Sequence, residues 1–301
     1  MNNGGAGAVY DDTVSRQQKI AIHGGRLLDP ANRIDGLHDL YIAGGRVVAL
    51  DNAPDGFQAE LEIDARNHIV CPGLIDLCAR LREPGLETKA DIASETRAAA
   101  SAGITTLVCP PDTDPVIDET AVVELIRRRA EAAGYARVLP LGALTRGLAG
   151  GHLAEMAALK GAGCIGVSNA MLPLTNTQVA RRSLEYAASF DLTVFISPVD
   201  PWLAVDGCAH EGQVATRLGL NGIPVAAETT ALARDLALLA ETGARAHFGR
   251  LSSARSLQMI ARAQADGLPV TADTGIGYLH LCDVDVGGFN SLCHVLPPLR
   301  D

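Results

Sequence analysis

The chain has 301 residues, 48% hydrophobic and 20% charged, so it can bury a large core in a barrel with a smaller domain beside it. Its formal charge of -10 disfavours nucleic acid and anionic membranes as partners. No apolar run approaches the roughly 18 to 20 residues of a membrane span. The first 18 residues lack the basic region and apolar stretch of a signal peptide, so we expect a cytoplasmic protein.

Residues 1–18 are rich in Gly and Asn and then polar, which predicts a flexible N-terminal arm. Residues 19–67 hold short strand-like runs at 19–23, 40–42 and 46–50, separated by the glycine pairs at 24–25 and 44–45. This pattern predicts a small β domain. In residues 68–301, apolar strand-like runs alternate with Ala-rich amphipathic helical patterns, which is typical of parallel βα units.

Seven such units follow one another along the chain. The predicted strands, each with the helix that follows it, are 70–77 with 89–101, 105–108 with 119–133, 136–141 with 153–160, 163–167 with 177–188, 192–196 with 228–241, 246–248 with 254–265, and a last strand at 268–272. They predict an α/β fold, a (β/α)8 TIM barrel. No eighth strand is visible before Asp301, so we expect the barrel to be truncated before its last strand.

Seven cysteines are scattered along the chain with no Cys-x-x-Cys pair, at positions 71, 78, 109, 164, 208, 282 and 293. Several lie in apolar strand-like runs. This usage predicts buried thiols in a reducing compartment.

The most informative segment reads Val70-Cys-Pro-Gly-Leu-Ile-Asp-Leu-Cys-Ala-Arg-Leu-Arg-Glu-Pro-Gly85. It resembles the first barrel strand of dihydroorotases, a family of metal-dependent cyclic amidohydrolases, in which Pro-Gly-Leu-Ile-Asp-Leu precedes His-x-His and Leu-Arg-Glu-Pro-Gly. Later stretches resemble the family's motifs in the same order: Gly103-Ile-Thr-Thr-Leu-Val-Cys-Pro-Pro-Asp-Thr-Asp-Pro115, Gly219-Leu-Asn-Gly-Ile-Pro-Val-Ala-Ala-Glu228, Thr242-Gly-Ala-Arg-Ala-His247 and Pro297-Pro-Leu-Arg300. The resemblance implies a metallo-dependent-hydrolase type barrel with a small β domain.

The resemblance also locates the family's metal ligands. Residues two apart in a strand share a face, so His-x-His aims two imidazoles at one metal. Those positions are Cys78 and Arg80 here, Asn169 stands for the metal-bridging carboxylate, and Ser197 and Arg250 stand for histidines. The family's zinc centre activates water to open or close the cyclic amide of dihydroorotate. All visible ligand positions are therefore replaced, and the strand-eight aspartate of the family lies beyond residue 301.

Two of the replacements, Arg80 and Arg250, are arginines, which stay protonated. A unit cation about 4 Å from a divalent ion would be repelled by on the order of 8 kcal/mol at an effective dielectric of about 20. We therefore expect no catalytic residue, no metal and no cofactor at these positions.

The substrate-binding positions of the family are changed as well. Arg82 matches the arginine that holds the substrate carboxylate, whereas Asp112 replaces a substrate-contacting asparagine. A carboxylate at 112 would repel an anionic substrate and can pair with Arg82 instead. Arg82 then has either a structural role or the role of a vestigial ligand-binding residue.

Neither cysteine nor histidine chemistry replaces the lost centre. Arg80 and Arg82 could activate Cys78 as a nucleophile, but no base can be placed beside it, so we interpret it as a small packed residue. His247, His280 and His294 lack Glu or Asp at ligand spacing, and we expect core or surface histidines.

These losses resemble a subfamily of inactive dihydroorotase homologues that serve as the non-catalytic chain of bacterial aspartate carbamoyltransferase. By that resemblance, the chain promotes the assembly of the aspartate carbamoyltransferase catalytic chain into a large hetero-oligomer in pyrimidine biosynthesis. Two alternatives remain. One is an amidohydrolase with a rearranged or metal-free site. The other is a non-catalytic sensor that binds a pyrimidine or carbamoyl-aspartate at Arg82.

Overall fold

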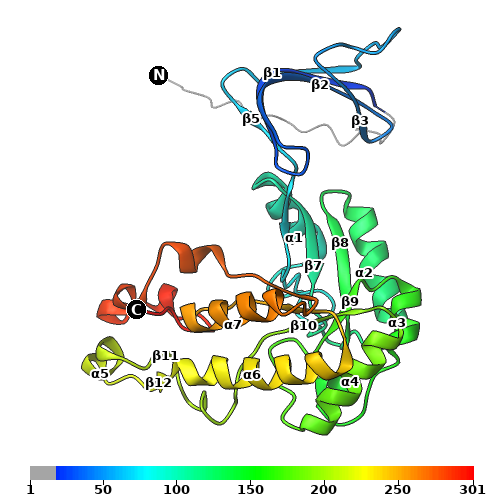
Figure 1. Cartoon of the computed structure of the whole chain (residues 1–301). Coiled ribbons are helices and arrows are strands. Elements are labelled where there is room, and N and C mark those ends of the chain that lie inside the picture. Colours follow the sequence, from blue (N-terminus) through cyan, green and yellow to red (C-terminus); the bar gives the residue numbers. More distant parts are fainter. Residues whose placement is uncertain (1–17) are drawn as a thin grey trace. The chain divides into compact units, whose positions relative to one another are not determined.

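The computed structural model describes residues 18–301, and the chain forms two compact units, Met1–Gly73 and Leu74–Asp301 (Figure 1). All of the predicted N-terminal arm except Gln18 lies outside the described residues. No helix in the described part of the chain is long and apolar enough to cross a membrane.

The first unit is a five-stranded sheet. Its strands are β1 (Ile20–Asp29), β2 (Ile34–Ala43), β3 (Arg46–Leu50), β4 (Leu61–Asp64) and β5 (Ile69–Val70). The order is β3-β2-β1-β4, and β5 also pairs with β1. The glycines at 24–25, which the sequence predicted to end the first strand, lie inside β1 instead. The register against β2 shifts between Ile22 and Gly25, and Gly24 has φ +70°, so this point is a β-bulge rather than a turn.

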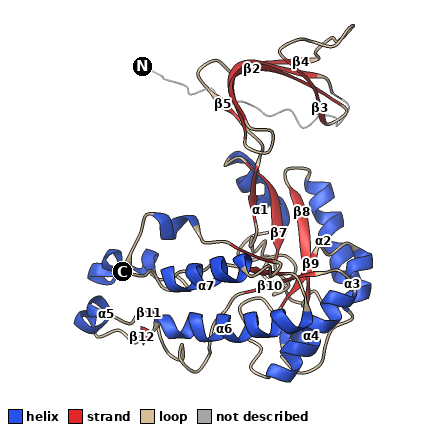
Figure 2. Ribbon diagram, viewed as in Figure 1, coloured by secondary structure: helices blue, strands red, loops and turns tan. Residues whose placement is uncertain are grey.

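The second unit holds a parallel sheet with neighbouring strands in chain order, β14-β13-β10-β9-β8-β7-β6. Its strands are β6 (Leu74–Asp76), β7 (Ile104–Cys109), β8 (Arg137–Ala143), β9 (Gly166–Ser168), β10 (Thr193–Ile196), β13 (Ala246–Phe248) and β14 (Val270–Ala272). Each pair of neighbours is parallel. A helix follows each strand up to β13, apart from the loop excursion after β10 (Figure 2). The curled sheet with its helices confirms the predicted (β/α)8-type α/β fold.

The helices of this unit are α1 (Ile92–Ser101), α2 (Thr120–Ala133), α3 (Met156–Ala162), α4 (Thr177–Ser189), α5 (Gln213–Leu218), α6 (Val225–Thr242) and α7 (Ala254–Ala265). Short 3-10 turns lie at Arg146–Leu148, Ile276–Leu279, Asp283–Phe289 and Ser291–Cys293. The loop excursion after β10 carries α5 and the two-residue strands β11 (Ala209–His210) and β12 (Gly222–Ile223). The sequence did not predict these three elements, because they are too short for a periodic pattern to show.

Apolar side chains between the sheet and the helices form the core of the second unit. Ile117 and Ile126 are fully buried in the cluster that packs α1 and α2 on the first strands, and Leu232 and Phe248 are fully buried in the cluster under α6 and α7. This core fixes the strand ends that carry the site.

The cysteines follow the prediction only in part. Cys109, Cys164 and Cys293 are buried, but Cys71 is exposed and the other three are half-buried. Cys71 lies in the short stretch after β5 rather than inside a strand, so nothing covers it.

Polar contacts attach the late Pro-Pro-Leu-Arg motif to this frame. Glu228 on α6 is 3% exposed, and its carboxylate accepts hydrogen bonds from the backbone and hydroxyl groups of Ser252 and Ser253 at 2.6–3.1 Å. Ser253 is also the N-cap of α7. Arg300 donates to the Ser252 hydroxyl at 3.1 Å and to the Ile223 carbonyl at 2.7 Å. The loop that follows β13 is thereby joined to α6, to β12 and to the C-terminal motif.

Candidate functional site

Polar residues in the strands of the second unit or just after them line one cavity. They are Cys78, Arg80, Ser168, Ser197, His247, Arg250 and Asp273. The carboxyl ends of parallel strands meet at one edge of a barrel, so residues far apart in sequence converge there. Four of the five predicted ligand positions are brought together in this way. The fifth, Asn169, lines a neighbouring cavity instead.

Arg80 is held by an ion pair. Its Nε donates to Asp112 Oδ2 at 2.7 Å, and both side chains are a little over one quarter exposed. The sequence paired Asp112 with Arg82, and this prediction is wrong. Asp112 Oδ1 is buried and has no hydrogen-bond partner among residues 18–301, so the carboxylate is only half satisfied by the arginine it contacts.

Arg82 lies next to this pair but takes no part in it. Its backbone is left-handed, with φ +65°, and its half-buried side chain lines a small cavity together with Arg80, Asp112 and Thr113. Within residues 18–301 its guanidinium makes no ion pair and donates no hydrogen bond. The neighbouring Glu83 is fixed by contrast, because its carboxylate accepts from the Ile92 backbone at 2.9 Å and lies 3.4 Å from Arg129.

Arg250 follows β13 and also has a left-handed backbone, with φ +59°. Its backbone N–H donates to Asp273 Oδ1 at 2.6 Å. Its guanidinium donates to the Ser197 hydroxyl at 3.2 Å and pairs with no carboxylate in the described part of the chain. The arginine therefore keeps an unneutralised charge at the strand ends.

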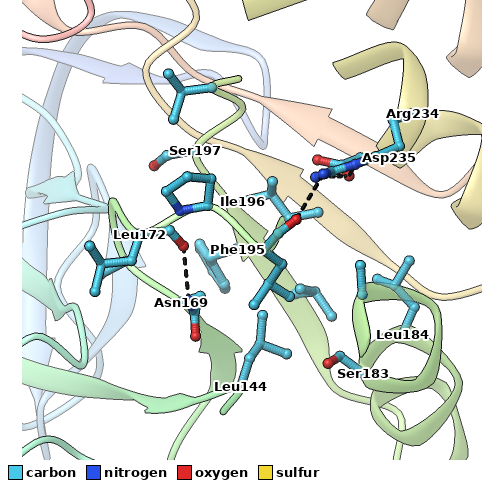
Figure 3. Close-up of a pocket in the computed structure, with 16 residues that line it drawn as sticks. Leu144, Asn169, Leu172, Ser183, Leu184, Phe195, Ile196, Ser197, Arg234 and Asp235 are labelled. Atoms are coloured by element: carbon cyan, nitrogen blue, oxygen red, sulfur yellow. Dashed lines mark hydrogen bonds and ion pairs between the residues drawn. The ribbon is translucent and has the colours of Figure 1, made fainter. Parts of the chain in front are cut away.

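Asn169, directly after β9, is 5% exposed and fully hydrogen-bonded. Its Oδ1 accepts from the Thr145 hydroxyl at 2.7 Å, and its Nδ2 donates to the carbonyls of Leu172 at 2.9 Å and Leu148 at 3.3 Å. Figure 3 shows the bond to Leu172. The amide serves as a clamp between loops, because it both accepts and donates, which an ionised carboxylate cannot do.

Cys78 is not an activated thiol. Burial raises the pKa of its thiol, and this effect outweighs the lowering by the charges of Arg250 and Arg80. A protonated thiol is a poor nucleophile and a poor metal ligand.

A network that the sequence did not reveal joins β13 to β14. His247 is 7% exposed, with its Nδ1 2.8 Å from the Thr271 hydroxyl and its Nε2 2.9 Å from Asp273 Oδ2. Burial raises the pKa of Asp273, but the hydrogen bonds from His247 and from the Arg250 backbone outweigh it and hold the pKa below its ordinary value. The available signal was the position of Asp273, one residue past a strand, where barrel site residues lie.

The donor set at these strand ends does not fit the zinc centre that the resemblance implies. No group of three or more His, Cys, Asp or Glu side chains within residues 18–301 is arranged to hold a metal ion. Guanidinium groups offer no lone pair to a metal, and both nitrogens of the His247 ring are already used.

From the hydrogen bonds of Asn169 we predict how a carboxylate at this position would change the stability of the fold. In Asn169→Asp, two carbonyls lose their donor and face a buried anion, so we expect the free energy of unfolding to fall by about 2 to 4 kcal/mol. Urea unfolding followed by circular dichroism measures it. Asn176→Asp is the matched control, because Asn176 caps α4 with Oδ1 alone and aspartate caps as well. Equal stability of Asn169→Asp and the unchanged protein would contradict the clamp.

The lowered pKa of Asp273 predicts a pH dependence. A carboxyl whose folded-state pKa lies below its ordinary value of 3.8 stabilises the fold above that pH, and the stabilisation is lost as the pH falls through the folded-state pKa. We therefore expect Asp273→Asn to be less stable than the unchanged protein near pH 7, with the difference shrinking below about pH 4.

Unfolding curves between neutral and acid pH test this dependence. Asp191→Asn is the control, because Asp191 is 77% exposed and also has a left-handed backbone, which asparagine tolerates. Its effect should stay within about 0.5 kcal/mol. A stability difference for Asp273→Asn that stayed constant down to acid pH would rule out the inferred role of its ionised form.

Comparison with known proteins places the chain in a family. Residues 67–256 match the sequence model of the family described as Dihydro-orotase-like. A dihydroorotase-like protein of Pseudomonas aeruginosa is 50% identical over 281 residues, which are 93% of this chain and 66% of that protein. A dihydroorotase of Syntrophotalea carbinolica is 43% identical over 282 residues, 94% of this chain and 66% of that protein.

Solved structures agree in fold. The L-hydantoinase (dihydropyrimidinase) from Arthrobacter aurescens superposes with a TM-score of 0.78 at 20% identity, covering 94% of this chain and 64% of that one. A D-hydantoinase gives a TM-score of 0.75 at 21% identity with the same coverage. This chain thus spans 66% of the length of the two curated relatives. The matched residues and the 50% identity show that the chain belongs to the dihydroorotase-like family.

Proposed function

We propose that this chain is a non-catalytic dihydroorotase homologue that acts as a structural, assembly-promoting subunit of aspartate carbamoyltransferase in pyrimidine biosynthesis. The observation that carries the non-catalytic part is the presence of two guanidinium groups, Arg80 and Arg250, in the cavity at the strand ends. Both stand at positions that the family resemblance assigns to metal-binding histidines.

The surrounding contacts support this proposal. Asn169 makes three hydrogen bonds within the protein. Its amide would have to break the two bonds to carbonyl groups before it could point into the cavity at the strand ends. Cys78 keeps its proton because burial raises its pKa. None of these groups can activate a water molecule as a zinc-bound carboxylate and imidazole set would.

The partner comes from the family resemblance, and one surface supports an assembly role. The segment 274–299 contains no Lys, Arg or Glu, and its exposed side chains include Ile276 at 75%, Phe289 at 64% and Leu292 at 88%. Exposed apolar side chains that gather in one segment commonly mark a surface for a partner. A cytoplasmic location is part of the proposal, because the catalytic chain acts in the biosynthesis of pyrimidines there.

Assembly is tested with the chain as it exists. It is mixed with the aspartate carbamoyltransferase catalytic chain of the same organism, and the mass of the products is measured by light scattering after size exclusion. We expect a defined complex heavier than either component. Leu292→Glu should weaken it, whereas Leu257→Glu on α7, a residue 52% exposed, should not. Two separate peaks for the unchanged chains would remove the proposed partner.

The same sample tests the loss of catalysis. We expect no stoichiometric zinc and no turnover of dihydroorotate. Zinc bound one to one and lost together with turnover, or turnover that persists without metal, would replace the proposal with the alternative of an amidohydrolase that has a rearranged or metal-free site.

A second candidate function is supported by the state of Arg82. Its guanidinium is unpaired within residues 18–301 and lines a cavity beside Thr113, as a residue that binds a carboxylate from outside would be. The candidate is a sensor that binds carbamoyl-aspartate or a pyrimidine without turning it over.

Calorimetry tests the sensor. Titration with carbamoyl-aspartate and with dihydroorotate should give saturable heat that Arg82→Ala abolishes, while Arg146→Ala, an exposed arginine paired with Glu155, leaves it unchanged. Flat traces with the unchanged protein would exclude a sensor at this position.

A further inference from the structure

We infer that the cavity at the carboxyl ends of β6, β10 and β13 binds a small oxyanion such as phosphate, bicarbonate or a carboxylate group. The site would lie where the family resemblance implies a divalent cation. Its ligand would therefore be an anion instead of a cation. This inference goes beyond the assembly role and does not depend on it.

The first argument is the supply of unused donors. The Arg250 guanidinium makes one contact within residues 18–301, to the Ser197 hydroxyl at 3.2 Å, and leaves its other N–H groups free. Because the Ser197 oxygen accepts that bond, its own hydrogen remains available. Arg80 donates only Nε to Asp112, so its two terminal nitrogens carry no protein partner in the described chain. Charged donors of this kind, arranged as planar forks, match an oxyanion.

The second argument is that the carboxylate that lines the cavity is already engaged. Asp273 is the one carboxylate among the described residues that line the cavity, and its two oxygens accept from His247 and from the Arg250 backbone. Asp76 and Asp112 line adjacent cavities. Asp76 accepts a hydrogen bond from the Cys78 backbone N–H, and Asp112 accepts one from Arg80 through Oδ2, whereas its buried Oδ1 has no partner among residues 18–301. An anion would therefore meet donors without displacing an internal hydrogen bond.

The remaining lining suits a small ligand. Cys78 contributes a protonated thiol, which does not repel an anion, because burial raises its pKa. Apolar side chains such as Leu141 and Phe195 complete the wall. An ion in such a partly dry site is screened less than at the surface, which strengthens its pairing with Arg250.

Calorimetric titration tests the inference. The full chain is titrated separately with inorganic phosphate, bicarbonate and acetate, at an ionic strength fixed with sodium chloride. We expect saturable binding of at least one of them, and the comparison identifies the preferred anion geometry. Arg250→Asn removes the charge, yet asparagine tolerates the left-handed backbone at this position, so the variant should fold. Its affinity should fall at least about tenfold, the effect of losing one charged hydrogen bond.

Matched variants separate this site from its neighbours. Arg245→Asn makes the same change at an exposed arginine paired with Asp191 and should bind as the unchanged protein does. The double variant Arg80→Gln with Asp112→Asn removes the ion pair without leaving a lone charge and should weaken binding. The absence of saturable binding for all three anions, or equal affinities for Arg250→Asn and Arg245→Asn, would overturn the inference.

Discussion

The convergence of seven parallel strand ends on one small volume is the constraint on which the rest of this protein depends. Charged side chains there lie close together and are only partly screened by solvent. Each charge must therefore be neutralised by an opposite charge or hydrogen bond, or it repels like charges nearby. Arg80 forms an ion pair with Asp112, and Asp273 accepts hydrogen bonds from His247 and from the backbone N–H of Arg250. The Arg250 guanidinium has no carboxylate partner in the described chain, and it gives the cavity a positive charge.

The sequence predicts the frame of the second unit closely, because long amphipathic helices and buried strands leave strong periodic patterns. The predicted strand 246–248 and helix 254–265 coincide with β13 and α7. The prediction of strand bounds is less accurate where this periodic pattern of apolar residues ends. The strand predicted at 70–77 is split between β5, which pairs with β1 in the first unit, and β6 at Leu74–Asp76. Apolar composition alone does not say which partner a residue pairs with.

The pairing of Asp112 shows why contacts at a site escape sequence reasoning. Arg80 and Arg82 are two residues apart and would share a face if the strand continued. The strand ends at Asp76, however, and the left-handed backbone of Arg82 turns its side chain out of that alternation. Arg80 is thereby the arginine that reaches Asp112. A resemblance identifies which residues stand at a site, whereas the dihedral angles of the loop decide which of them touch.

The present contacts at the positions that the resemblance assigns to metal ligands work together against a metal centre. Changing Arg250 to histidine alone would still leave the Arg80 cation and a protonated Cys78 beside any metal. Changing Arg80 alone would leave Asp112 half-buried without its ion-pair partner. Changing Asn169 alone would break the contacts between the loops that follow β8 and β9. Each single reversal would therefore either lose a present contact or leave an unfavourable charge beside the metal, so the effects of these neighbouring positions would not add independently.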